Sequence, residues 1–558
     1  MTALMWAARD NSNPEVLAAL INAGTEPEVL RSNINARDDM GWTLLMVATW
    51  HSSSPEILAT LINAGADVNA RDDKGWTALM VATWHNFNPE VLTTLINAGA
   101  DVNAQDDNGM TPLMWAAWHN SNPKVLTTLI DAGADVNAQD NDGSTALMRA
   151  ARYNSNPEVL ATLINAGAGP KVLRSNINAQ DNRGLTALMW AARHNSNPEV
   201  LTTLINANAE PEVWRSNVNA RDDNNMTALM WAAWYNSNPK VLAALINAGA
   251  DINAKDDNSM TALMWAAWHN SNPEVLAALI NAGADINTQD DKSRTALMWA
   301  AWHNSNPEVL AALINAGANV NTQDDKGQAA LMLAAQNNPD PEKLTTLINA
   351  GADTNARDED GRTALMVAAQ YSSNPEVLIA LINAGADVNA QDYDGWTALM
   401  GAALKNPDLE VLTALINAGT EVNAQDSDGW TALMGAAWKN PDLEVLATLI
   451  NAGTDVNART EDGRTALILA AFENPNPEVL AALMNAGADI NARTEDGWTA
   501  LMWAAEKNSN PEVITTLLKF GADPEAKDKD NNRAIDYARK NENLQNTDAL
   551  QQLDDASH

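Results

Sequence analysis

Cysteine, long apolar runs and basic side chains are absent or scarce in this chain of 558 residues. The absence of cysteine excludes disulfides, thiolate metal ligands and a cysteine nucleophile. No run of about 18 apolar residues predicts a membrane span, and no signal-like segment follows Met1. With 34 basic residues against 71 acidic ones, the net charge of -37 disfavours nucleic acid and anionic membrane surfaces as partners. The compartment stays open.

What the chain does contain is one segment repeated many times, represented by residues 261–294, TALMWAAWHNSNPEVLAALINAGADINTQDDKSR. Thr261 precedes apolar residues at helical spacing, which predicts a short first helix with a threonine N-cap. Asn272 and Pro273 predict the start of a second helix, and Gly283 predicts its end in a left-handed conformation.

The second helix is predicted to bury its apolar residues Val275, Leu276, Leu279 and Ile280. The polar residues 284–294 predict a turn or hairpin that leads to the next copy. A single helix pair has too narrow an apolar face to be stable alone, so we expect successive copies to stack and complete one another's cores.

The pattern TALMWAA followed by PEVLAALINAGADINTQD resembles the ankyrin repeat, whose unit begins T-P-L-H-x-A and whose second helix ends in G-A-D-x-N. The resemblance implies an all-α repeat solenoid in which helix-turn-helix units, joined by hairpin loops, stack into a curved superhelix. The chain departs from the family because Ala replaces Pro in most copies, with Pro retained at Pro112, Met replaces His as at Met264, and the period is 34 rather than 33. Since the family's His makes polar links between repeats, we expect apolar Met contacts to join these repeats instead.

The copies continue along the whole chain at a spacing of 34 residues, with three longer steps of 41. We expect one continuous array over residues 1–532, followed by a C-terminal capping repeat and short tail over 533–558. By their cap positions, the copies in the array begin near residues 2, 43, 77, 111, 145, 186, 227, 261, 295, 329, 363, 397, 431, 465 and 499.

Each longer step holds seven additional residues between the second helix and the hairpin, within 25–33, 169–176 and 210–217. One hypothesis is that these insertions bend the solenoid or offer a secondary contact; the other is that they are copies of one variant repeat. No comparable cap precedes the first repeat, which predicts exposed apolar surface there unless another segment or molecule covers it.

Variation between copies is concentrated at a few positions, which we name relative to the cap residue. The pre-cap position directly precedes it, the inner position is four residues after it, and the outer and edge positions are seven and eight after it. In ankyrin proteins the pre-cap, outer and edge positions usually face the concave groove and contact ligands. The resemblance therefore implies ligand binding by Trp42, Trp50, His51, Trp76, Trp84, His85, Trp118, His119, Arg152, Arg193, His194, Trp234, Tyr235, Trp268, His269, Trp302 and His303.

The tryptophans at these positions have two interpretations. Trp and Tyr dominate binding hot spots, so a Trp-lined groove in an acidic chain predicts a protein or peptide partner, with an Arg- or Lys-rich segment fitting best. Alternatively, tryptophans recur at fixed spacing only because one repeat was duplicated, and they stack on one another along the array without binding a ligand. In this interpretation the acidic residues only keep the array solvated. The inner column, which includes Trp265, favours the structural interpretation.

Neither a metal site nor an enzyme is predicted. Histidines at equivalent positions of successive repeats lie side by side rather than converging on one ion, although such groove residues could make binding sensitive to pH. Strings such as Asp140-x-Asp142-Gly143 resemble the opening of a calcium loop but lack its closing Glu, which favours hairpin turns. No catalytic set or phosphate-binding loop unique to one repeat occurs, so no cofactor is expected.

The leading hypothesis is therefore a non-enzymatic scaffold that binds a protein or peptide along its concave face. The alternative is a self-assembling structural protein that forms an oligomer or filament through its uncapped first repeat.

Overall fold

The computed structural model describes residues 34–166, 177–207, 217–337, 340–406, 408–440 and 442–557, and isolated residues before 34. Its contacts group into two compact units, Met1–Asp291 and Lys292–His558, here called the N-terminal and the C-terminal unit. The exposed apolar face expected at the first repeat lies outside the described residues, as do nearly all residues of the three insertions.

Each repeat folds into two short antiparallel helices. In the N-terminal unit the first helices are α4 (Leu44–His51), α6 (Ala78–His85), α8 (Pro112–His119), α10 (Ala146–Tyr153), α13 (Ala187–His194), α16 (Ala228–Tyr235) and α18 (Ala262–His269). The second helices are α5 (Pro55–Asn63), α7 (Pro89–Asn97), α9 (Pro123–Asp131), α11 (Pro157–Ala166), α14 (Pro198–Asn206), α17 (Pro239–Asn247) and α19 (Pro273–Asn281).

The C-terminal unit repeats this arrangement. Its first helices are α20 (Ala296–His303), α22 (Ala330–Asn337), α24 (Ala364–Tyr371), α26 (Ala398–Lys405), α28 (Ala432–Lys439), α30 (Ala466–Glu473), α32 (Ala500–Lys507) and α34 (Ala534–Ala538). Its second helices are α21 (Pro307–Asn315), α23 (Pro341–Asn349), α25 (Pro375–Asn383), α27 (Leu409–Asn417), α29 (Leu443–Asn451), α31 (Pro477–Asn485), α33 (Pro511–Lys519) and α35 (Asp548–Ala556). A short 3-10 helix, η1 (Glu542–Leu544), precedes α35.

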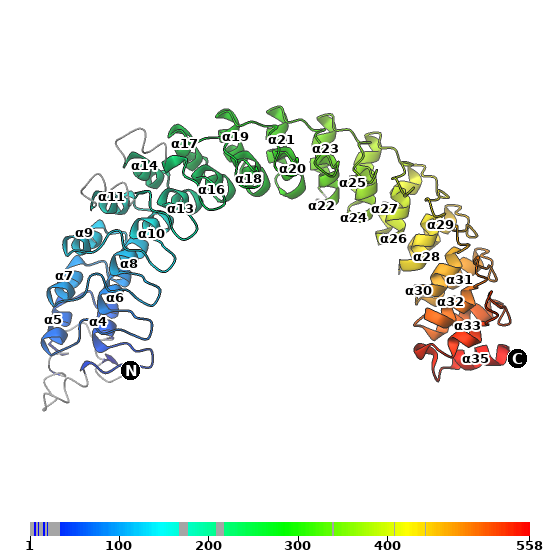
Figure 1. Cartoon of the computed structure of the whole chain (residues 1–558), viewed down its shortest axis with the longest axis horizontal. Helices are drawn as coiled ribbons and strands as arrows, with labels where there is room; N and C mark the ends of the chain where they lie inside the picture. Colours follow the sequence, from blue (N-terminus) through cyan, green and yellow to red (C-terminus); the bar gives the residue numbers. More distant parts are fainter. Residues whose placement is uncertain are drawn as a thin grey trace. The chain divides into compact units, whose positions relative to one another are not determined.

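Within each unit the first helices follow one another in one layer and the second helices in a neighbouring layer (Figure 1). Consecutive first helices pack on one another, as α16 does on α18, and so do consecutive second helices. The only β structure among the described residues consists of isolated bridges in two hairpins, Arg37 with Thr43 and Gln323 with Ala329. The all-α repeat fold expected from the sequence is thus confirmed.

The predicted helix signals are confirmed in the representative repeat. The Oγ1 of Thr261 accepts a hydrogen bond from the backbone N–H of Met264 at 3.4 Å and so caps α18. Asn272 accepts from the N–H of Glu274 at 3.0 Å, and Pro273 occupies the first position of α19. Gly283 has a φ of 92°, a conformation that strains any residue with a Cβ.

The core lies between neighbouring repeats. Val275, Leu276 and Leu279 are fully buried, as predicted, whereas Ile280 near the end of α19 is only half-buried. Met264 is also buried, as the expected apolar contact between repeats requires.

The links between repeats are nevertheless not only apolar, and this part of the expectation is wrong. Asn270, buried at the end of α18, donates from its Nδ2 to the carbonyls of Asn236 at 2.9 Å and Ala233 at 3.2 Å in the preceding repeat. Equivalent asparagines repeat this contact, for example Asn406 to Ala369 and Asn508 to Ala471. We call this series the asparagine ladder. The asparagine ladder provides polar links between consecutive repeats, although the family's histidine is absent.

The last described residues form a further pair of helices. Residues 534–538 form α34 and residues 548–556 form α35, which packs on α33 and α34. Arg533 donates to the carbonyl of Ser557 at 3.0 Å, and Arg539 pairs with Asp554 at 2.7 Å, so α35 is tied to the rest of its repeat. Its outer face carries exposed Gln551 and Gln552.

Candidate binding surface

The hairpins position the side chains of the first helices. In the representative repeat, the Oδ1 of Asp256 accepts from the N–H groups of Asn258 and Met260, both at 2.9 Å, which closes the turn. The N–H of Asp257 donates to the carbonyl of Asn224 in the preceding hairpin at 3.2 Å. Because each hairpin is fixed to its neighbour, the Oδ2 of Asp256 is held toward the inner position of α18.

Inner tryptophans are bound to this hairpin aspartate. The Nε1 of Trp265 donates to the Oδ2 of Asp256 at 3.0 Å, and Trp115, Trp190 and Trp231 do the same with their own hairpins at 3.0–3.1 Å. A hydrogen bond to a carboxylate contributes about 1.5–3 kcal/mol. These indoles are at most 9% exposed. The contacts support the structural interpretation of the inner column.

Burial also affects the pKa of these aspartates. It raises the pKa of Asp106 and Asp256, while the backbone and indole N–H donors act in the opposite direction. In one repeat an arginine replaces the indole: the half-buried Arg149 forms an ion pair with the buried Asp140.

The predicted site residues divide sharply by exposure. Trp42 at the pre-cap position is half-buried, whereas Trp76 at that position is buried at 8% exposure. All outer residues are half-buried: Trp50, Trp84, Trp118, Arg152, Arg193, Trp234, Trp268 and Trp302. All edge residues are exposed: His51, His85, His119, His194, Tyr235, His269 and His303.

Outer residues of one repeat pack on the inner residue of the next. Trp234 stacks on Trp265 with ring centroids 4.1 Å apart and an interplanar angle of 13°. Where an arginine occupies the outer position, its guanidinium replaces the ring: Arg152 lies 4.1 Å from the Trp190 ring and Arg193 lies 4.5 Å from the Trp231 ring. Such stacks contribute about 0.5–2 kcal/mol each.

In the first described repeats the rings meet edge to face instead of in parallel. Trp50 contacts Trp42 at 5.6 Å and Trp84 at 5.1 Å, and Trp84 contacts Trp76 at 4.9 Å. The structure therefore brings the predicted residues of the N-terminal unit into one chain of ring and guanidinium contacts. We call the outer and edge residues of this unit, from Trp50 to His269, the aromatic surface.

Trp302 and His303 belong to the C-terminal unit, where their side chains contact each other. Their rings lie 4.5 Å apart, and Trp302 also contacts Trp299 at 5.8 Å. Arg294, which precedes the cap, lies 4.0 Å from the Trp299 ring.

Edge histidines lie against the outer rings, as His269 does on Trp234 at 5.1 Å. Desolvation lowers the pKa of His119. It also lowers the pKa of His194 to about 4, and the charges of Arg152 and Arg193 act in the same direction. His194 is nevertheless an exposed residue. The pKa of His303 is lowered too, by desolvation and by Arg294 and Lys343. These three rings are neutral at neutral pH, which weakens the expectation of a pH-sensitive surface there.

Two features of the site were not predicted from the sequence. One is the contact of a hairpin aspartate with an inner tryptophan or arginine nine positions later, which the constant spacing of pairs such as Asp256 and Trp265 could have revealed. The other is a pocket in the C-terminal unit at Gly401, where glycine takes the inner position. A glycine in a column of large side chains was the available signal.

The described residues lack what a metal site or a membrane-spanning helix requires. They contain no group of three His, Cys, Asp or Glu side chains arranged to hold a metal ion, and no helix among them is long and apolar enough to cross a membrane. The calcium-like string at Asp140 is a turn, in which its Oδ1 accepts from the N–H groups of Asp142 and Ser144.

Fold and site together define a helical repeat protein whose repeats share one framework and differ at the side chains they present. A sequence model described as "Ankyrin repeats (3 copies)" matches overlapping stretches from 1–72 to 470–554. These stretches cover nearly the whole chain, which therefore belongs to the ankyrin repeat family. Members of this family are typically protein-binding scaffolds and usually not enzymes. No curated protein matches the chain.

Proposed function

We propose that the chain binds a protein or peptide through the aromatic surface of its N-terminal unit. The observation that supports this best is the exposure pattern, because half-buried outer residues and exposed edge residues alternate along successive first helices. Packing between repeats covers part of each outer side chain and leaves the rest in contact with water.

The edge residues add area that internal packing does not use. Tyr153 and Tyr235 are 40% and 45% exposed, although each lies on an outer tryptophan at 4.6 and 4.7 Å. Aromatic groups held by neighbours lose little entropy on binding, which suits them to recognition.

The chemistry of the partner follows from charge. With a net charge of -37, the chain attracts a basic segment. Arginines and lysines of that segment would lie on the outer indoles, as Arg152 and Arg193 already do on Trp190 and Trp231.

Selection of displayed random peptides on the full chain, followed by calorimetry of the enriched sequences, tests the proposal. We expect enrichment of Arg- and Lys-rich peptides and loss of their binding in the variant with Trp118, Trp234 and Trp268 all changed to Ala. Trp438→Ala is the matched control, since Trp438 holds the same outer position in the C-terminal unit. Selected peptides that bind the triple variant as tightly as the unchanged chain would refute the proposal.

Residues 533–558 are proposed to act as the C-terminal cap of the array over 1–532, because α35 covers α33 and presents its polar residues outward.

A further inference from the structure

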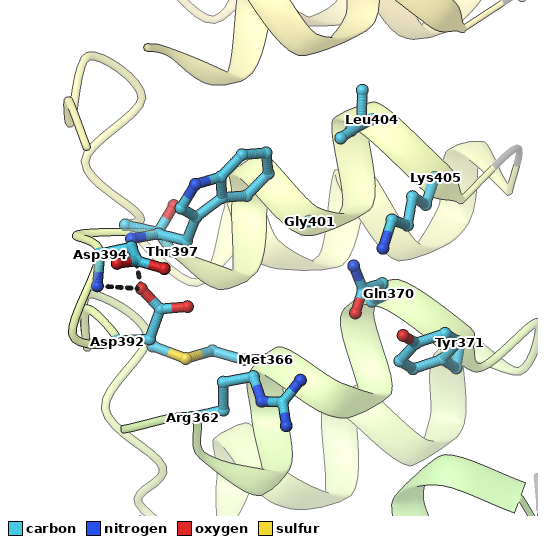
Figure 2. Close-up of a pocket in the computed structure, with 11 residues that line it drawn as sticks. Arg362, Met366, Gln370, Tyr371, Asp392, Asp394, Thr397, Gly401, Leu404 and Lys405 are labelled. Atoms are coloured by element: carbon cyan, nitrogen blue, oxygen red, sulfur yellow. Dashed lines mark hydrogen bonds between the residues drawn. The ribbon is translucent and has the colours of Figure 1, made fainter. Parts of the chain in front are cut away.

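The pocket at Gly401 lies where other repeats place an inner side chain. It has a volume of ≈ 340 Å³, within the range of about 300–1,000 Å³ typical of ligand pockets. Gly401 on α26 faces Gln370 on α24, and Tyr371, Leu404 and Lys405 border the same space (Figure 2). A Cβ built on Gly401 would meet only the Cβ of Gln370, at 3.7 Å, so the space is open.

The repeat around α32 shows what occupies this space when a side chain is present. Trp503 takes the inner position there, with Arg464 lying 5.5 Å from its ring and Trp498 contacting it at 4.6 Å. Arg464 and Trp498 are the pre-cap residues of two consecutive repeats. At the pocket the same two positions hold Arg362 and Trp396. The surroundings of an indole are therefore present, while the indole is not.

The pocket also has a hydrogen-bond acceptor at the place expected for an indole N–H. The Oδ1 of Asp392 accepts from the N–H groups of Asp394 at 3.1 Å and Trp396 at 2.8 Å (Figure 2). In the N-terminal unit the second oxygen of the equivalent aspartate accepts from an inner tryptophan, as Asp256 does from Trp265. Within the part of the chain that the structure describes, no donor reaches the Oδ2 of Asp392.

The neighbouring repeats show that this combination is local to Gly401. Gly435 also takes an inner position, but a Cβ there would meet Leu404 at 3.4 Å, so this leucine already takes part of the space. Val367 in the repeat before Gly401 and Leu333 in the repeat before that fill their inner positions with buried aliphatic side chains.

We propose that the pocket binds the side chain of a tryptophan from a partner protein. The indole lies between α24 and α26, donates its N–H to the Oδ2 of Asp392 and contacts the ring of Trp396. Arg362 and Lys405 at its rim present cationic groups to the π face of the indole, and Arg362 also pairs with Asp358 and Asp360. The site is in the C-terminal unit and does not depend on the proposed aromatic surface.

The test uses the full chain and a blocked pentapeptide, acetyl-Gly-Gly-Trp-Gly-Gly-amide, whose tryptophan carries a 5-fluoro label for ligand-observed ¹⁹F NMR. We expect the peptide to bind the unchanged chain and Gly401→Ala alike, since alanine leaves the space open. Gly401→Trp fills the pocket and should abolish binding. Gly401→Leu should weaken it at least tenfold, and it keeps the test decisive if the tryptophan variant fails to fold, because Leu333 and Leu469 hold the same position elsewhere.

Matched probes identify the occupant. Methylation of the indole nitrogen should weaken binding about tenfold, since it removes the donor to Asp392. The same peptide with arginine in place of tryptophan should not bind. The proposal is overturned if the peptide does not bind the unchanged chain, if both filling variants bind it equally well, or if the arginine peptide binds more tightly. Binding of free indole without binding of the pentapeptide would also overturn it, since the occupant would then be a small metabolite.

Discussion

The repeat that begins at Thr261 in the N-terminal unit and the repeat that begins at Thr397 in the C-terminal unit use the same framework around opposite inner residues. Both first helices have 8 residues and a threonine cap, and both end in an asparagine that belongs to the ladder. The inner residue is the large, hydrogen-bonded Trp265 in one and Gly401 in the other. The helix pair thus forms without the inner side chain, which leaves this position free to strengthen the stack or to open a pocket.

The largest effect on stability is expected when the inner Trp265 is changed to glycine, the residue that holds this position at Gly401. Trp265→Gly removes a buried indole, its hydrogen bond to Asp256 and its stack on Trp234, and it adds the helix cost of glycine. We expect a loss of about 4 kcal/mol in the free energy of unfolding of the surrounding repeats, measured by hydrogen exchange of α18 amides in urea. Asp256 should then become more exposed. A loss below about 1 kcal/mol would show that the inner column contributes little to stability.

A second difference between the units is a buried lysine. Lys343 in α23 holds the position at which Val275 lies in α19; it is fully buried, and its Nζ has no hydrogen-bond partner among the described residues. Lys343→Met keeps much of the volume without a polar group, and we expect a gain of about 1–3 kcal/mol. Urea unfolding at pH 7 measures this gain, with Lys405→Met at an exposed site as the control. An unchanged or lower stability would mean that Lys343 has a partner in solution.

The same lysine gives the C-terminal unit a dependence on alkaline pH. Burial lowers the pKa of Lys343 from its ordinary value of 10.5, against the attraction of Asp340. Between the lowered pKa and 10.5 the unfolded chain binds more protons than the folded chain, so stability rises with pH in that window. Stability relative to Lys343→Met should therefore increase as pH approaches 10.5, as urea unfolding at several pH values will show. A difference in the free energy of unfolding between the two chains that stays constant with pH would contradict this prediction.

The smallest effect is expected from a change that leaves the pocket open. Gly401→Ala adds one methyl group with ordinary contacts and improves helix propensity, so we expect a gain of about 0.5–1 kcal/mol by thermal or urea unfolding. Gly99→Ala offers a contrasting control, because its φ of 91° strains alanine and should lower stability. Destabilisation by Gly401→Ala would show that the neighbours close over this glycine.

The sequence predicted local structure well, because its signals are local. Thr261, Asn272, Pro273 and Gly283 each act within a few residues, and the structure confirms all four. The asparagine ladder was missed because the buried Asn270 bonds to carbonyls of a different repeat. The pocket was missed for a similar reason, since a glycine produces a cavity only when the preceding repeat does not fill it. At Gly435 Leu404 takes up that space, whereas at Gly401 Gln370 leaves it open.

The asparagine ladder has one more consequence, which concerns the length of the chain between its steps. Asn270 reaches the preceding ladder residue across 34 positions, yet Asn195 and Asn236 make the same contact to Asn154 and Asn195 across 41. The ladder therefore keeps the same contact whether the repeat has 34 residues or seven more between its second helix and the next hairpin. A foreign peptide of seven residues grafted at the corresponding point of a 34-residue repeat should therefore leave the register of the array unchanged, as it is across the 41-residue steps.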